Sequence, residues 1–88
     1  MGEAMKDDTA LLADYAANGS ESAFEELVSR HAGLVYSAAL RQVGKPGLAE
    51  EITQAVFCIL ARKAGSLGAR TVVSGWLYRT TRFTSLKS

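Results

Sequence analysis

The apolar positions of residues 48–63 recur every three or four residues. This spacing places Leu48, Ile52, Val56, Ile59 and Leu60 on one side of a helix with about 3.6 residues per turn. The positions outside this stripe combine acidic and polar side chains with one aromatic ring, namely Glu50, Glu51, Thr53, Gln54 and Phe57. The stripe by itself does not bury that ring, so the second face is either solvated or a docking surface.

A short helix is predicted before this segment, ending at Gly19. Any of Asp7, Asp8 and Thr9 can cap its N-terminus, and the Asn-Gly pair supplies the left-handed residue that ends it. Residues 1–7 show no pattern, and we expect them to form a disordered end.

A longer helix is predicted next, running to Val43. Ser20 can cap it, and so can Ser22, which would form a capping box with Glu25. Gly33 lies inside this helix, where glycine is unfavourable, and we interpret it as the site of a close helix crossing.

The Gly-Lys-Pro-Gly run at residues 44–47 is the clearest turn signal in the chain. It predicts that the helices on either side form an antiparallel hairpin. Residues 66–74 lack a helical period and are predicted to be a loop, after which Ser74 caps a last helix. No stop signal follows that helix, so we expect the protein to continue past Ser88.

The predicted fold is all-α, a small bundle of three main helices plus a short N-terminal helix, in one domain over residues 8–88. The excess of Ala and Leu over β-branched residues and the single Pro favour helix throughout. No apolar run reaches the roughly 18 residues that would span a membrane, and one Cys cannot form a disulfide within the chain. We therefore expect a cytoplasmic protein without membrane contact.

Catalysis is the function class that the residues support least. The single His and single Cys, His31 and Cys58, lie on different predicted helices, and we interpret both as structural, with the cysteine buried. The adjacent carboxylates of Glu50 and Glu51 point about 100° apart on a helix, so they do not converge on a substrate. The chain is not predicted to be an enzyme, and we expect no metal, cofactor or small-molecule substrate.

Charge is strongly segregated along the chain, although the net charge is only +1. Residues 1–30 carry seven acidic and two basic side chains, a balance of −5, whereas residues 52–88 carry six basic side chains and no acidic one. The six are Arg62, Lys63, Arg70, Arg79, Arg82 and Lys87. Such a basic segment is typical of a polyanion contact, although Arg62 and Lys63 can also simply offset a helix dipole.

Aromatic side chains lie among the cations of this basic segment. Single-stranded nucleic acid binds such mixtures, because phosphates meet the cations and unstacked bases lie on the rings. Trp76 and Leu77 are interpreted as core residues, and Tyr78 as a DNA-binding candidate. The small residues of the predicted loop are suited to accept an extruded base.

Three motifs in these helices resemble a known family. They are Gly19-Ser20 with Ala23-Phe24, Leu27-Val28 and His31; Leu48-Ala49-Glu50-Glu51 with Gln54 and Phe57; and Gly75-Trp76-Leu77-Tyr78-Arg79 with Thr81-Arg82. Together they resemble conserved region two of bacterial RNA polymerase sigma factors of the extracytoplasmic-function class. The resemblance covers roughly residues 8–86, and its most specific parts are the acidic-x-x-Gln-x-x-Phe and Trp-Leu-Tyr-Arg motifs.

The resemblance implies that the helix over residues 48–63 binds core RNA polymerase. In the family this helix contacts the clamp-helix coiled coil of the largest subunit. Glu50, Glu51 and Gln54 would then be polar contacts, with Phe57 at the edge of the interface.

The resemblance also implies that the loop and the start of the last helix recognise promoter DNA. In the family they read and help melt the minus-ten element, holding a flipped base of the single-stranded non-template strand. The matching DNA-facing candidates are Arg70, Thr71, Ser74, Arg79 and Arg82. Phe83 departs from the pattern, because the family commonly has Asn there. An anti-sigma protein is a further candidate partner.

An alternative function uses the same helices without DNA. A truncated sigma relative could be a helical interaction domain that binds only a protein. Salt dependence of nucleic-acid binding distinguishes the two, because phosphate contacts weaken as salt rises.

Overall fold

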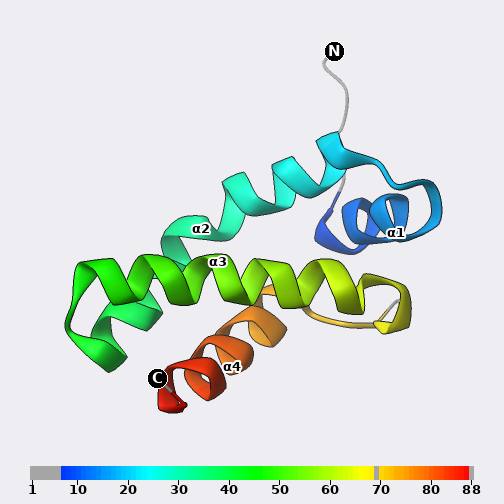
Figure 1. Cartoon of the computed structure of the whole chain (residues 1–88). Helices are drawn as coiled ribbons and strands as arrows, with labels where there is room; N and C mark the ends of the chain where they lie inside the picture. Colours follow the sequence, from blue (N-terminus) through cyan, green and yellow to red (C-terminus); the bar gives the residue numbers. More distant parts are fainter. Residues whose placement is uncertain (1–6, 69, 88) are drawn as a thin grey trace.

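The chain is all-α, as predicted. The computed structural model describes residues 7–68 and 70–87, and these contain four α-helices and no strand. The helices are α1 (Asp8–Asn18), α2 (Glu21–Val43), α3 (Pro46–Lys63) and α4 (Val73–Leu86), and a 3-10 turn, η1 (Ala64–Ser66), follows α3 (Figure 1). None of the described helices is both long and apolar enough to cross a bilayer.

The N-terminal helix is held at both ends by local signals. Asp7 is the N-cap, and its carboxylate accepts a hydrogen bond from the Ala10 N–H at 2.8 Å. Gly19 ends the helix with φ 65°, a left-handed conformation that glycine adopts without strain. Residues 1–6 of the expected disordered end lie outside the described residues.

The long helix α2 begins at the first of its two predicted caps. The Ser20 hydroxyl accepts from the Ala23 N–H at 3.3 Å, so the capping box of Ser22 is not what starts the helix. Gly44 ends it with φ 71°, and its N–H donates to the Leu40 carbonyl at 2.7 Å.

Helices α2 and α3 form the predicted antiparallel hairpin (Figure 1). Pro46 occupies the first turn of α3, where its missing N–H costs no hydrogen bond, so the helix begins two residues before Leu48. Helix α4 then packs against both members of the hairpin.

One hydrophobic core joins α2, α3 and α4. Leu27 and Val35 of α2, Val56 and Leu60 of α3, and Leu77 of α4 are all fully buried. Each such side chain contributes about 1.5–3 kcal/mol through removal of apolar surface from water. The predicted stripe of α3 is therefore a core face, and Leu77 is the core residue that the sequence indicates.

The carboxylate of Asp8 on α1 forms hydrogen bonds with two side chains of α2. Asp8 accepts hydrogen bonds from Arg30 Nη1 at 3.1 Å and from His31 Nε2 at 2.8 Å, while Arg30 Nε also donates to Glu26 at 3.1 Å. Partial desolvation acts to lower the pKa of Arg30, but the hydrogen bonds to Asp8 and Glu26 outweigh it and raise that pKa. His31 thus has a structural contact with α1, and Leu11 of the same helix is buried in the core.

The segment between α3 and α4 is more ordered than the predicted loop. The turn η1 extends α3, and α4 begins at Val73, so Ser74 lies inside the first turn instead of capping it. Val72 is the N-cap residue and makes no side-chain capping bond. Val73 is only 2% exposed, and its burial favours the earlier start over a Ser74 cap.

The predicted close helix crossing at Gly33 is wrong. Gly33 is exposed, and a Cβ placed on it would meet no atom within 4 Å. Its neighbours therefore do not require the missing side chain.

Two glycine substitutions are expected to change stability in opposite directions. Gly33→Ala should raise the free energy of unfolding by about 0.5–1 kcal/mol, because alanine favours helix and has open space there. Gly44→Ala should lower it by about 1 kcal/mol, because φ 71° is strained for a residue with a Cβ. Urea unfolding followed by circular dichroism measures both, and a loss of stability in Gly33→Ala would contradict the exposed position of this residue.

Candidate functional site

The outward face of α3 carries the polar residues that the sequence singled out. Glu50, Glu51 and Gln54 are all exposed there. Neither carboxylate forms an ion pair with any other residue of the described ranges. Both are therefore available to a partner.

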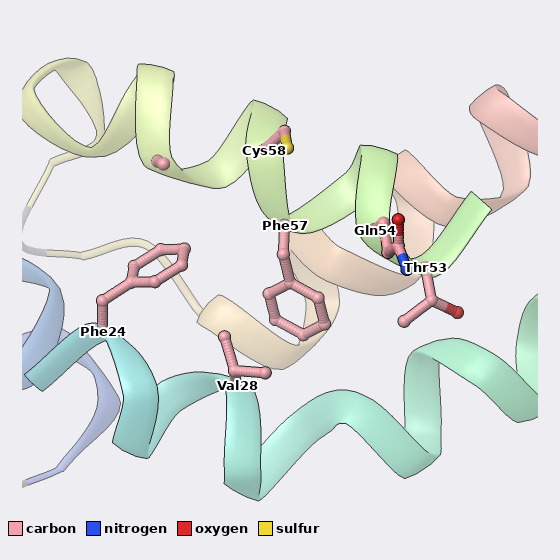
Figure 2. A pocket seen from close by; sticks show the side chains of 7 residues that line it. Phe24, Val28, Thr53, Gln54, Phe57 and Cys58 are labelled. Atoms are coloured by element: carbon pink, nitrogen blue, oxygen red, sulfur yellow. The ribbon is translucent and has the colours of Figure 1, made fainter. Parts of the chain in front are cut away.

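A hollow of about 420 Å³ lies beside this face, between α2 and α3. Its lining is predominantly apolar and consists of Phe24, Val28, Thr53, Gln54, Phe57, Cys58 and Ala61. Figure 2 shows the ring of Phe57 projecting from α3 toward Val28 of α2, with Phe24 rising from the same helix as Val28. Gln54 belongs both to the exposed polar face and to the rim of this hollow.

Phe57 is a core residue, and its expected place at the edge of an interface stays a prediction. It is 6% exposed and belongs to the main hydrophobic cluster. The periodic stripe of α3 omitted it because that stripe described one face, whereas α3 is covered by α2 and α4 together. Phe57 therefore forms the floor of the hollow, and little of its ring is available to a partner.

Cys58 is exposed, so the prediction of a buried cysteine is wrong. It follows Gln54 by one helical turn and shares its outward position on α3. Its thiol lines the hollow described above.

The outward face of α4 brings three DNA candidates together. Tyr78, Arg79 and Arg82 are exposed, and they line a shallow hollow of about 250 Å³ with Phe83 and Leu86. The opposite side of the helix is buried at four positions that are four residues apart, namely Val73, Leu77, Thr81 and Ser85. Two large apolar side chains on the outward face are exposed to solvent, since Phe83 is 59% and Leu86 74% exposed.

The other DNA candidates lie at different positions. Arg70 is exposed in the turn before α4, which the Thr71 N–H closes by donating to the Gly68 carbonyl at 3.0 Å. Thr71 is half-buried, and its carbonyl accepts from the Thr9 hydroxyl of α1 at 3.4 Å. Ser74 is half-buried in the first turn of α4, so it and Thr71 are less accessible than the exposed members of the set.

The cations of α4 have no acidic partner within the described part of the chain. The ion pairs found there join Arg30 to Asp8 and Glu26, and His31 to Asp8, all on α1 and α2. Arg79 and Arg82 therefore keep their charge uncompensated at the surface. Unpaired cations on one helix face attract polyanions over a distance of about a Debye length.

Sequence reasoning did not anticipate a groove between α3 and α4. It has a volume of about 390 Å³ and is lined by Ile59, Lys63, Trp76, Arg79, Thr80 and Phe83. Trp76 is half-buried and packs against the core, as its predicted core role requires. The spacing of Trp76, Arg79, Thr80 and Phe83 along one side of a helix was the available signal for this groove.

The described residues contain no group of three or more His, Cys, Asp or Glu side chains placed to hold a metal ion. The two faces carry groups suited to recognition, namely carboxylates and an amide on α3 and guanidinium groups and rings on α4.

Comparison with known protein families gives one match. Residues 27–88 match the family described as Sigma-70 region 2, a span that contains α3 and α4 entirely and most of α2. Searches of curated proteins and of solved structures returned no match.

Substitutions at Phe57 and Gln54 are expected to change the free energy of unfolding by different amounts, because Phe57 is buried in the core and Gln54 is exposed at the surface. Phe57→Ala should lower the free energy of unfolding by about 3 kcal/mol, because it leaves a cavity under the hollow. Gln54→Ala, three residues away, should change it by less than about 0.5 kcal/mol. Urea unfolding measures both values, and equal effects would contradict the assignment of Phe57 to the core.

Proposed function

The chain belongs to the sigma-70 region 2 family, and from that membership we propose that it is the region 2 module of a sigma factor of the extracytoplasmic-function class. The family supports a role in RNA polymerase binding and promoter recognition, and its domains are not catalytic. The finer proposal concerns which surface meets which partner. It places the module in the cytoplasm, where both partners are found.

In this proposal the outward face of α3 binds the clamp-helix coiled coil of the largest polymerase subunit. The unpaired carboxylates of Glu50 and Glu51 and the amide of Gln54 supply polar contacts. The apolar hollow between α2 and α3 lies directly beside them and can receive a side chain of the partner. Phe57 supports this interface from below as the floor of the hollow.

The turn before α4 and the outward face of α4 bind the minus-ten element of the promoter. The observation that carries this half of the proposal is that Tyr78, Arg79 and Arg82 are exposed together on α4. The sequence contains no acidic residue after Glu51 that could neutralise the two arginines. Phosphates would meet the arginines and Arg70, while Thr71 and Ser74 border the turn that accepts a flipped base. Helping to melt the promoter then means capturing bases of the non-template strand as they unpair.

A second candidate function is a protein-interaction domain without DNA binding. The exposed apolar side chains of Phe83 and Leu86 favour it, because apolar patches often mark protein contacts. An anti-sigma protein is a partner that would fit either function. Salt dependence of nucleic-acid binding separates the two candidates.

A labelled single-stranded minus-ten oligonucleotide is expected to bind weakly and to lose affinity as salt rises. Arg79→Ala with Arg82→Ala should weaken binding and reduce the slope of log K against log salt by about 1.4, because each single-strand phosphate contact contributes roughly 0.7. Fluorescence anisotropy at several salt concentrations measures both quantities.

The matched control for this experiment is Arg41→Ala with Lys45→Ala, which removes the same charge near the turn between α2 and α3. This variant should bind nearly as well as the unmodified chain. If both double variants lose the same affinity for the oligonucleotide, the effect comes from the net charge of the domain and not from a site on α4. Binding that is absent or independent of salt would favour the protein-interaction domain without DNA binding.

Association with the isolated clamp coiled coil is expected to depend on the outward face of α3. Gln54→Ala should weaken it several-fold and Glu51→Lys more strongly, because the latter replaces an attractive charge with a repulsive one. Gln42→Ala, an exposed glutamine on α2, is the control and should leave the affinity unchanged. Titration calorimetry gives the affinities, and circular dichroism verifies that helical content is retained. Unchanged affinity in both α3 variants would mean that this face of α3 is simply solvated and does not bind the coiled coil.

A further inference from the structure

An aromatic ring among cations on one surface of the molecule matches an apolar hollow among carboxylates on another. The first surface, the α4 patch, consists of Arg79, Arg82, Phe83, Leu86 and Lys87. The second is the hollow of about 420 Å³ between α2 and α3. We propose that the α4 patch of one copy of this chain docks head to tail in the hollow of a second copy.

Phe83 is the anchor of the α4 patch. Its side chain is 59% exposed, and the exposed Leu86 follows it along the helix. Such apolar surface leaves water when a partner covers it, which favours association. Aromatic side chains that fill a pocket of the partner supply much of the affinity of protein interfaces.

The hollow has the apolar lining that such an anchor requires. Phe24 and Val28 of α2 border it, and Phe57 of α3 forms its floor (Figure 2). Its volume lies within the range of about 300–1,000 Å³ that is typical of sites enclosing small ligands, so the ring of Phe83 can enter. That ring would meet two aromatic side chains, and aromatic pairs gain free energy beyond the removal of apolar surface from water.

Exposed carboxylates border the hollow on both of its helices. Four glutamates each precede a lining residue by three positions and therefore share its side of the helix, namely Glu21, Glu25, Glu50 and Glu51. None of them pairs with a basic residue of the described ranges. Arg62 lies one turn beyond Cys58 at the other end of the hollow, and the carboxylates outnumber it.

The cations of the α4 patch complement these carboxylates. Arg79 and Arg82 are exposed beside Phe83, and Lys87 Nζ lies 4.6 Å from the centroid of its ring. A guanidinium group can bind a carboxylate through two parallel hydrogen bonds. Entry of the ring into the hollow would bring the arginines to the glutamates, so apolar burial and charge attraction favour the same contact.

The contact joins two copies because each chain carries both halves of it. The patch and the hollow share no lining residue, and their helices are packed in one core, which keeps the two surfaces apart within a chain. Every other copy presents the complementary surface. One ring and a few ion pairs make a small interface, so we expect a dissociation constant on the order of 100 µM.

Self-association would cover the surfaces that the proposed function assigns to other partners. A docked pair hides Glu51 and Gln54 of one copy and Arg79 and Arg82 of the other. Core polymerase and promoter DNA would then compete with a second copy of the chain, and the unbound module would be held in a form that meets neither.

Sedimentation equilibrium from about 10 µM to about 1 mM measures the association. The weight-average mass is expected to rise above that of the monomer as concentration increases. Raising the salt from about 0.05 M to about 0.5 M should weaken the association at least about three-fold, because salt screens the attraction between carboxylates and guanidinium groups.

Two variants each block one half of the contact. Phe83→Ser removes the anchoring ring, and Cys58→Arg places a cation and a longer side chain in the hollow. Each variant alone should associate at least about ten-fold more weakly. The matched controls Leu34→Ser and Gln42→Arg make the same kinds of change at exposed positions of α2 and should leave the association unchanged. Because all four positions are exposed, each variant should keep its helical content, which circular dichroism verifies.

Mixing the two variants tests the head-to-tail arrangement. The Cys58→Arg copy keeps an intact α4 patch and the Phe83→Ser copy keeps an intact hollow. Their mixture is expected to form a one-to-one dimer with an affinity near that of the unmodified chain, and nothing larger. A mixture that stays monomeric would overturn the proposal.

The remaining outcomes also decide the proposal. A monomer at every concentration, association that does not respond to salt, or equal losses in the variants and their controls would overturn it. If the chain is monomeric and Phe83→Ser instead weakens binding of the clamp coiled coil, a different protein occupies the α4 patch. The sedimentation experiments contain neither polymerase nor DNA, so failure of the self-association leaves the proposed function in place, and failure of the proposed function leaves their result in place.

Discussion

The burial of α3 on two flanks is the constraint on which the rest of the structure depends. Helix α2 covers one flank and α4 the other, and Val56 and Leu60 are fully buried between them. Only a narrow outward strip of α3 remains for polar side chains, and that strip contains Glu50, Glu51 and Gln54. The core thus determines which side chains of α3 can meet a partner.

The same packing keeps two surfaces of opposite charge at a fixed separation. Acidic side chains face outward on α3 and basic ones on α4, and both helices are anchored in one core. In the proposed function, like charges at the wrong surface would repel, so each face would select its partner partly by excluding the other. A polyanion is disfavoured at α3, and a basic protein surface is disfavoured at α4.

Local signals in the sequence were sufficient for the presence of the helices and for the ends set by Gly19 and Gly44. Gly44 shows why, since its left-handed conformation follows from its own residue type. The burial of Phe57 was not foreseen and Cys58 was wrongly predicted to be buried, because both depend on which neighbour covers each flank of a helix, and periodicity within one helix carries no such information. The groove between α3 and α4 was missed for the same reason, as Lys63 becomes part of it only after the two helices pack.

The contact between Asp8 and the pair Arg30 and His31 has a consequence for where the folded unit begins. The family match starts at residue 27, yet both partners of Asp8 lie inside the matched span. A chain cut at that boundary would lose the carboxylate that the two side chains contact and would expose the core next to Leu11 and Leu12. The folded unit is therefore longer than the matched span, and α1 packs as part of it.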